Sequence, residues 1–150
     1  MIKQPHWCAT LWTTETWIFM LLRLFLSLRW LCAGYTKFIG VDGSVACSNF
    51  HQMKANAMMT TFMEKTPLPK ILLYPYIHTL PYVELLLGLG LLLGLWSRWC
   101  LILSGLFYVS LAFGQMLIGG HDTVHAIAVH LILVVIALHF SQHGRWNLRS

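Results

Sequence analysis

Four long apolar segments, separated by short polar stretches, make up most of this 150-residue chain. They run from Thr16 to Ile39, from Ile71 to Trp96, from Trp99 to Ile118 and from Thr123 to Phe140. Each is close to the roughly 20 residues that a helix needs to cross a hydrocarbon layer about 30 Å thick. A membrane-spanning backbone must satisfy its own N–H and C=O groups, so these segments should be helices. The pattern therefore predicts an all-α integral membrane protein with a single four-helix bundle.

The stretches between the spans predict how the helices are connected. Ser97 and Arg98 leave room only for a very short turn, and the polar run 119–122 is equally tight. The second, third and fourth spans should therefore be antiparallel neighbours. Residues 46–65 form a longer, amphipathic connector between the first two spans, which we expect to lie in the membrane plane or to pack as a lid over the bundle. Its methionines favour apolar packing over a copper site, because no Met-x-Met run or cysteine pair accompanies them.

The composition argues against some classes of protein. The chain is 57% hydrophobic and 10% charged, which leaves no soluble domain once the spans are removed. Its net charge of +5 does not indicate a nucleic-acid partner, because the basic residues are scattered and partly intramembrane. Four spans place both termini on one side of the membrane. The basic residues are nearly balanced across it, but Arg98, Arg145 and Arg149 lie near span ends and favour cytoplasmic termini.

The four cysteines form no closely spaced pair. Cys32 and Cys47 could both lie toward the outer half of the membrane, where a disulfide is permitted if that side is oxidising. The interpretation that we favour treats all four, with Cys8 and Cys100, as unpaired small hydrophobes.

One face of the first span carries residues that do not suit lipid. Arg23, Trp30, Gly34 and Lys37 are separated by seven, four and three positions, so a helix places them on the same side. This side should face the bundle. Arg29 points elsewhere and should either reach the membrane surface with its long side chain or contact a partner protein.

Glu84 is the acidic residue of the second span. Counted at about 1.5 Å per residue from the side of the termini, it lies at a depth similar to that of Arg29 and within a long side chain's reach of Arg23. A Glu–Arg pair is the expected way to hold both charges inside a membrane. Such a pair could be a purely structural bridge or the polar floor of a site for a proton-coupled or quinone-like ligand, and the sequence leaves both open.

The opposite end of the bundle has the greatest concentration of polar side chains. His121 and His125 are four positions apart, and Gln115, His78 and Lys37 lie at a similar depth. Two such histidines could bind a metal, hydrogen-bond a quinone carbonyl, relay a proton or make only interfacial hydrogen bonds. A metal site needs three or four convergent ligands, so the sequence supports neither a metal nor a haem.

Three stretches together resemble the DoxX family. The first span contains LLRLFLSLRWLCAGYTKF, and the second, with its approach, reads EKTPLPKILLYPYIHTLPYVELLLGLGLLLGLWSR. The last two spans contain FGQMLIGGHDTVHAIAVHLILVVIALHF, followed by GRWNL. The order and spacing of these stretches, over about residues 15–148, carry the resemblance. The additional histidines of the fourth span and the methionine-rich connector depart from the family pattern.

The resemblance implies a four-helix protein of the bacterial inner membrane. Some DoxX proteins are membrane subunits of thiosulfate:quinone oxidoreductase, others are linked to redox homeostasis, and many have no assigned activity. Arg23, Lys37 and Glu84 correspond by position to the polar motif residues of the family. A quinone is therefore the cofactor that the resemblance implies, in a bundle surrounded by lipid.

Two functional hypotheses follow. In the first, the protein is a membrane subunit that handles a quinone or related redox ligand in a polar pocket of the bundle. In the second, it is a non-catalytic accessory or structural subunit that binds other membrane subunits, or copies of itself, in a larger complex. A small transporter is weaker, because four spans make a narrow bundle. The sequence has no catalytic triad, phosphate loop or cysteine-pair metal motif, which leaves enzymatic activity open. The expected ligand-site residues are Arg23, Lys37, Glu84, Gln115, His121 and His125.

Overall fold

The computed structural model describes residues 14–40 and 43–141 of the chain. Within this part, four helices are long and apolar enough to cross a membrane, as the sequence predicts. They are α1 (Thr14–Phe38), α4 (Lys70–Leu93), α5 (Ser97–Ile118) and α6 (His121–Phe140). The protein is thus an all-α, multi-pass membrane protein. The predicted N-terminal and C-terminal segments, with Cys8, Arg145 and Arg149, lie outside the described residues.

Glycines in the left-handed conformation end two of the spans. Gly94, with φ of 73°, follows α4, and the Leu95 N–H donates back to the Gly90 carbonyl at 3.1 Å. Gly119, with φ of 78°, follows α5, and the Gly120 N–H donates to the Gln115 carbonyl at 2.9 Å. A glycine adopts this backbone conformation without a Cβ clash, which allows the chain to reverse at once. The second span consequently ends at Leu93 rather than at the predicted Trp96.

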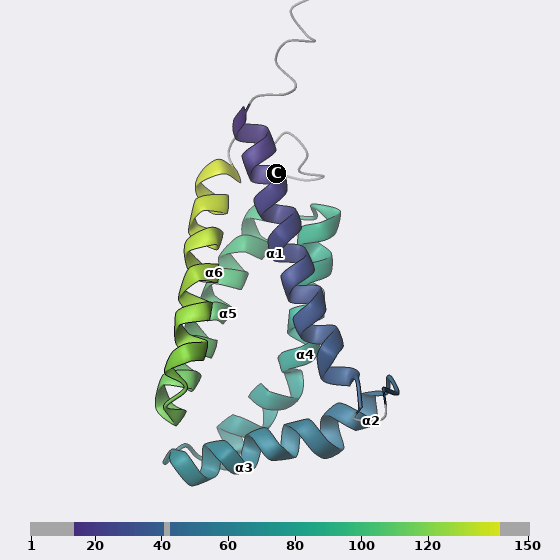
Figure 1. Cartoon of the computed structure of the whole chain (residues 1–150), viewed down its shortest axis with the longest axis vertical. Coiled ribbons are helices and arrows are strands. Elements are labelled where there is room, and N and C mark those ends of the chain that lie inside the picture. The colour runs from purple at the N-terminus through teal and green to yellow at the C-terminus, as the bar shows by residue number, and fades with distance from the viewer. Residues whose placement is uncertain (1–13, 41–42, 142–150) are drawn as a thin grey trace, which may run out of the picture.

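The four spanning helices alternate in direction, and a helical segment crosses one end of them (Figure 1). The start of α1 and the end of α6 lie at the same end of the bundle, at the top of the view, together with the α4–α5 turn. We call this the terminal end. The opposite end, where α1 stops and α6 begins, is covered by the connector and is called the connector end. The first and last described helices therefore begin and end, respectively, at the same end of the bundle.

The connector consists of α2 (Cys47–Asn49), a π-helical stretch η1 (Phe50–Lys54) and α3 (Ala55–Lys65). Phe50 and Ala55 are fully buried in a cluster with Phe38, Leu73 and Ile77. This burial shows that the segment packs as a lid against α1 and α4, one of the two arrangements that its amphipathic pattern predicts.

Two lysines of the connector hold the ends of spanning helices. The Lys54 Nζ donates to the Thr36 carbonyl at 2.7 Å and to the Ile39 carbonyl at 2.9 Å, at the end of α1. The Lys65 Nζ donates to the Ile118 carbonyl at 3.5 Å, at the end of α5. The last carbonyls of a helix have no partners within the helix and carry partial negative charge, so an ammonium group stabilises them. The lid is thus attached at two separate helix ends.

Small residues let α1 and α4 pack closely. A Cβ added to Gly34 would lie 2.7 Å from Leu85 Cγ, and a Cβ added to Gly88 would lie 2.8 Å from Leu31 Cγ and 2.9 Å from the Leu31 backbone nitrogen. None of these three distances is compatible with a real Cβ atom. The two contacts also fix the register, because Gly34 lies beside Leu85 while Leu31 lies beside Gly88.

Cys32, Cys47 and Cys100 are free thiols. The structure therefore confirms the unpaired interpretation for these three cysteines.

Because α1 and α4 approach closely, the stability of the protein should be sensitive to alanine in place of a glycine at their contact. Gly88→Ala should destabilise the protein by about 1–3 kcal/mol, because the added methyl forces the two backbones apart. Gly105→Ala in α5 is the matched control: its Cβ would meet Val134 Cγ1 at 3.5 Å, an ordinary contact, and should be tolerated or slightly stabilising. Chemical unfolding in detergent micelles measures both variants. Equal stability of the two would contradict the packing described here.

Candidate functional site

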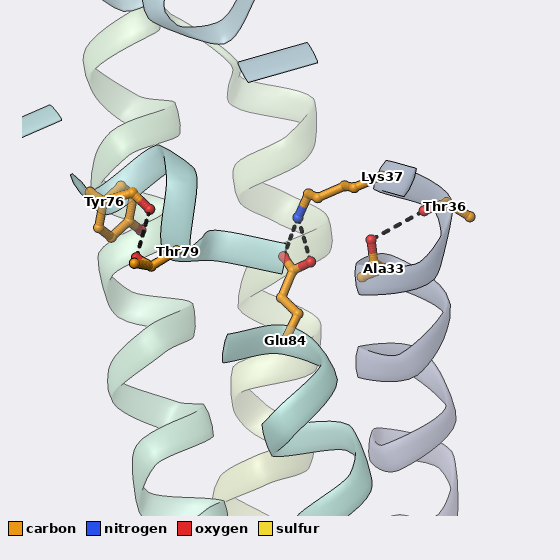
Figure 2. A network of polar contacts seen from close by, with 6 residues as sticks. All are labelled: Ala33, Thr36, Lys37, Tyr76, Thr79 and Glu84. Atoms are coloured by element: carbon orange, nitrogen blue, oxygen red, sulfur yellow. Dashed lines mark hydrogen bonds and ion pairs between the residues drawn. The ribbon is translucent and has the colours of Figure 1, made fainter. Parts of the chain in front are cut away.

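A buried ion pair joins the last turn of α1 to the middle of α4. The Lys37 ammonium donates to both carboxylate oxygens of Glu84 (Figure 2). Only 3% of the Glu84 side chain and 16% of the Lys37 side chain are exposed. Burial in a low-dielectric region strengthens the attraction and also makes either charge costly without the other.

The predicted Glu–Arg pair is wrong, because the partner of Glu84 is Lys37. The depth argument assumed that the spans begin at a common surface, but α1 continues past the α4–α5 turn at the terminal end (Figure 1). The contacts of Gly34 with Leu85 and of Leu31 with Gly88 set the true register. In this register Glu84 lies beside the last two turns of α1, within reach of Lys37.

The two arginines of α1 have different surroundings. Arg29 is exposed, yet it lies close enough to interact electrostatically with both Lys37 and Glu84. Arg23 lies nearer the terminal end, with its guanidinium 5.8 Å from the centre of the Phe19 ring. Its Nη1 atom is buried and has no hydrogen-bond partner within the described part of the chain. The predicted inward face of α1 is confirmed by the burial of Trp30 and Gly34 and by the Lys37 ion pair.

A group of aromatic side chains from α1, α5 and α6 packs together inside the bundle. The Trp30 and Tyr108 rings are stacked with their centres 4.4 Å apart. The centre of the Phe107 ring lies 5.7 Å from that of Trp30, and the centre of the His130 ring lies 5.7 Å from that of Tyr108. Tyr108 also lies within electrostatic range of Glu84 and Arg29. Trp30 and Tyr108 are 2% and 3% exposed, respectively. We call these two side chains the aromatic pair.

Both members of the aromatic pair carry an unsatisfied donor. The Trp30 Nε1 and the Tyr108 hydroxyl are buried and have no hydrogen-bond partner among residues 14–40 and 43–141. A nearby phenol, that of Tyr76, differs in this respect, because the Ser110 hydroxyl donates to its oxygen at 3.0 Å. Buried donors are normally paired, and an unpaired one costs about 1–3 kcal/mol. The aromatic pair therefore presents two donors that a ligand acceptor could satisfy.

The polar residues predicted for the connector end do not gather around Glu84. His121 and His125 are exposed on α6, and Gln115 folds back against Gly120 in the α5–α6 turn. None of the three contacts the Lys37–Glu84 pair in the structure. Within the described ranges, no group of three or more His, Cys, Asp or Glu side chains is placed to hold a metal ion.

His78 belongs to a different cluster, which the sequence reasoning missed. Its ring stacks on Tyr74 at 4.0 Å and on His51 of the connector at 5.3 Å, and its Nδ1 donates to the Tyr74 carbonyl at 2.9 Å. The His51 Nε2 hydrogen-bonds with the Tyr82 hydroxyl at 3.0 Å. The signal was present as the four-residue spacing of Tyr74, His78 and Tyr82, which places them on one face of α4. This cluster helps to hold the lid on α4.

Because Lys37 and Glu84 form an ion pair, the effects of replacing them on stability should not be additive. Lys37→Met or Glu84→Met alone should cost about 3–5 kcal/mol, because each leaves a buried charge without its partner. The double variant should recover most of that loss. Arg98→Gln, at the exposed start of α5, is the control and should have little effect. Unfolding in bicelles measures the four free energies, and additive single effects would show that the two side chains do not interact.

Comparison with known proteins identifies the family. The sequence model of the DoxX family matches residues 18–118, which extend from the first turns of α1 through the lid to the end of α5. The match ends before α6, whereas the resemblance noted in the sequence extended to residue 148. The chain matches no curated protein and no solved structure. Since the match covers about two thirds of the chain, including both helices that supply the ion pair, this membrane protein belongs to the DoxX family.

Proposed function

We propose that this DoxX-family protein is a membrane subunit that binds a quinone or a related redox ligand inside its helix bundle. The ligand head would lie between the Lys37–Glu84 pair and the aromatic pair. The observation that carries this proposal is the presence of two unpaired buried donors, the Trp30 Nε1 and the Tyr108 hydroxyl, in a bundle that also contains a buried charge pair.

The chemistry of a quinone head suits these donors. A quinone is a flat ring with two carbonyl oxygens, which accept hydrogen bonds and donate none. The Trp30 N–H and the Tyr108 O–H can each donate to such an oxygen, which would remove the cost of burying them unpaired. The surrounding rings, including Phe107, offer flat apolar surface to the ligand ring. An apolar tail would extend into lipid.

The proposed site is smaller than the set that the sequence predicts. Lys37 and Glu84 remain in it and would set its polarity, and Trp30 and Tyr108 are added. Arg23 lies toward the terminal end, while Gln115, His121 and His125 lie on or beside the surface at the connector end, so we do not include these four in the ligand-contacting group.

Removing one donor at a time tests the proposal. Trp30→Phe and Tyr108→Phe keep the rings but remove the N–H or the O–H, and each should weaken binding of a short-tailed ubiquinone by about two- to tenfold, the effect of one hydrogen bond. The ligand-free variants should be as stable as the wild type or more stable, because an unpaired polar atom has been removed. Titration calorimetry and thermal unfolding measure the two effects.

Trp99→Phe is the matched control for that experiment, because the Trp99 side chain is 64% exposed on α5. Its quinone affinity should equal that of the wild type. The proposal fails if the wild-type protein binds no quinone, or if both donor variants bind it as tightly as the wild type does.

The alternative function, an accessory or structural subunit, has one observation in its favour. Arg29 is exposed near the middle of α1, where a carboxylate from a neighbouring membrane subunit or a second copy could pair with it. Native purification separates the two functions. An accessory subunit should be isolated together with other chains and bind no quinone, whereas the ligand-handling subunit should bind quinone as an isolated protein.

We also propose that the protein lies in the bacterial inner membrane with its termini in the cytoplasm. Membership of the DoxX family supports the location, and Arg98, which lies at the terminal end, supports the orientation. A phosphatase reporter, which is active only outside the cytoplasm, should be inactive when fused after residue 150. An active fusion would reverse the orientation.

A further inference from the structure

The charges inside the membrane layer are unequal in number. Among the described residues, and away from the first and last turns of the spanning helices, Arg23 and Arg29 are cationic and Glu84 is the single carboxylate. Lys37 lies in the last turn of α1 but turns inward to Glu84. The surroundings of Glu84 therefore contain two cations, its ion-pair partner Lys37 and, farther away, Arg29, and one anion.

This excess positive charge is costly in an apolar medium. Arg29 lies fifteen residues after Thr14 and nine before Phe38, which places it ~22 Å and ~14 Å from the two ends of α1. Acyl chains offer no anion at that depth. Because Lys37 already holds both oxygens of Glu84, Arg29 has no ion-pair partner among the described residues. A ligand that brings its own negative charge would complete the cluster.

The unpaired donors of the aromatic pair favour an oxygen acceptor attached to a ring. Tyr108 lies within electrostatic range of both Arg29 and Glu84, and its hydroxyl and the Trp30 Nε1 have no acceptor. On the other side of Tyr108, His130 of α6 stacks on Phe25 with ring centres 6.2 Å apart and interplanar angle of 14°. Rings from α1, α5 and α6 thus pack around Tyr108, and Phe25, four residues before Arg29 on α1, belongs to this group.

We propose that the ligand of this site is a lipophilic anion, a quinone-type ring that carries an ionised hydroxyl group, and that Arg29 is the residue that selects its charge. The proposal rests on the proposed function and makes it more specific, since an ordinary quinone is neutral. Arg29 would pair with the ionised oxygen, the Trp30 N–H and the Tyr108 O–H would donate to the oxygens of the ring, and Lys37 would stay with Glu84.

Two ring compounds of nearly equal shape test the charge preference. The first, 2-hydroxy-1,4-naphthoquinone, is an anion at neutral pH, and the second, 2-methoxy-1,4-naphthoquinone, cannot ionise. Titration of the full-length protein in nanodiscs of uncharged lipid should show that the hydroxy compound binds about tenfold more tightly, the effect of ~1.4 kcal/mol. This comparison uses the wild-type protein, so it does not depend on the folding of any variant.

Variants of Arg29 then test whether its charge causes the preference for the anionic compound. Arg29→Gln should bind the two compounds equally, and Arg29→Lys should keep most of the preference for the anion. Arg98→Gln removes an exposed arginine from the start of α5 and should leave the preference unchanged.

The outcomes separate this inference from the function on which it rests. If the wild type binds the methoxy compound as tightly as the hydroxy compound, or if Arg29→Gln retains the preference, the charge-selecting role of Arg29 is overturned while quinone binding stands. If the wild type binds neither of these compounds nor a short-tailed ubiquinone, the proposed function fails and this inference fails with it.

Discussion

The ion pair between Lys37 and Glu84 is the interaction on which the arrangement of the site depends. In a hydrocarbon layer either charge alone would be far less stable than the pair, so the helices that carry them must stay together and in register. The glycines at the α1–α4 contact make this possible, because the two backbones approach until Gly34 meets Leu85 and Gly88 meets Leu31. Packing and electrostatics thus impose the same register. In the same bundle Trp30 stacks on Tyr108 of α5, and Arg29 lies within electrostatic range of a carboxylate that Lys37 already neutralises.

Two lysines of the connector, Lys54 and Lys65, bind partners other than Glu84. Lys54 is held by the last carbonyls of α1 and Lys65 by the Ile118 carbonyl, so neither ammonium competes with Lys37 for the carboxylate. The stacked His51 and His78 rings and the buried Phe50 add further contacts to α4 and α1. The lid therefore closes the bundle at the end nearest the ion pair.

Much of the fold could be predicted from the sequence, because span length, hydropathy and helical period are local properties. The four spans, the amphipathic connector and the inward face of α1 all follow from them. The Glu–Arg pair was wrong because depth along one helix does not give the offset between two helices, which depends on how far α1 extends past the α4–α5 turn. Tyr108 and His51 were missed for a related reason: each interacts with a residue that is distant in the sequence, Tyr108 with Trp30 and His51 with Tyr82. The shared depth of Gln115, His121 and His125 similarly could not show whether their side chains point toward Glu84 or toward the surface.

The most direct test of this account is a distance measured in lipid between the two ionised groups of the pair. Solid-state NMR on protein labelled with ¹⁵N at the lysine Nζ atoms and ¹³C at the glutamate carboxyl carbons can detect dipolar coupling between them, with Glu84→Gln used to assign the signal. The account predicts a strong coupling, typical of a contact ion pair, that disappears in the variant. A Glu84 carboxyl carbon with no coupling to any lysine nitrogen, or one coupled to a labelled arginine side chain instead, would contradict it.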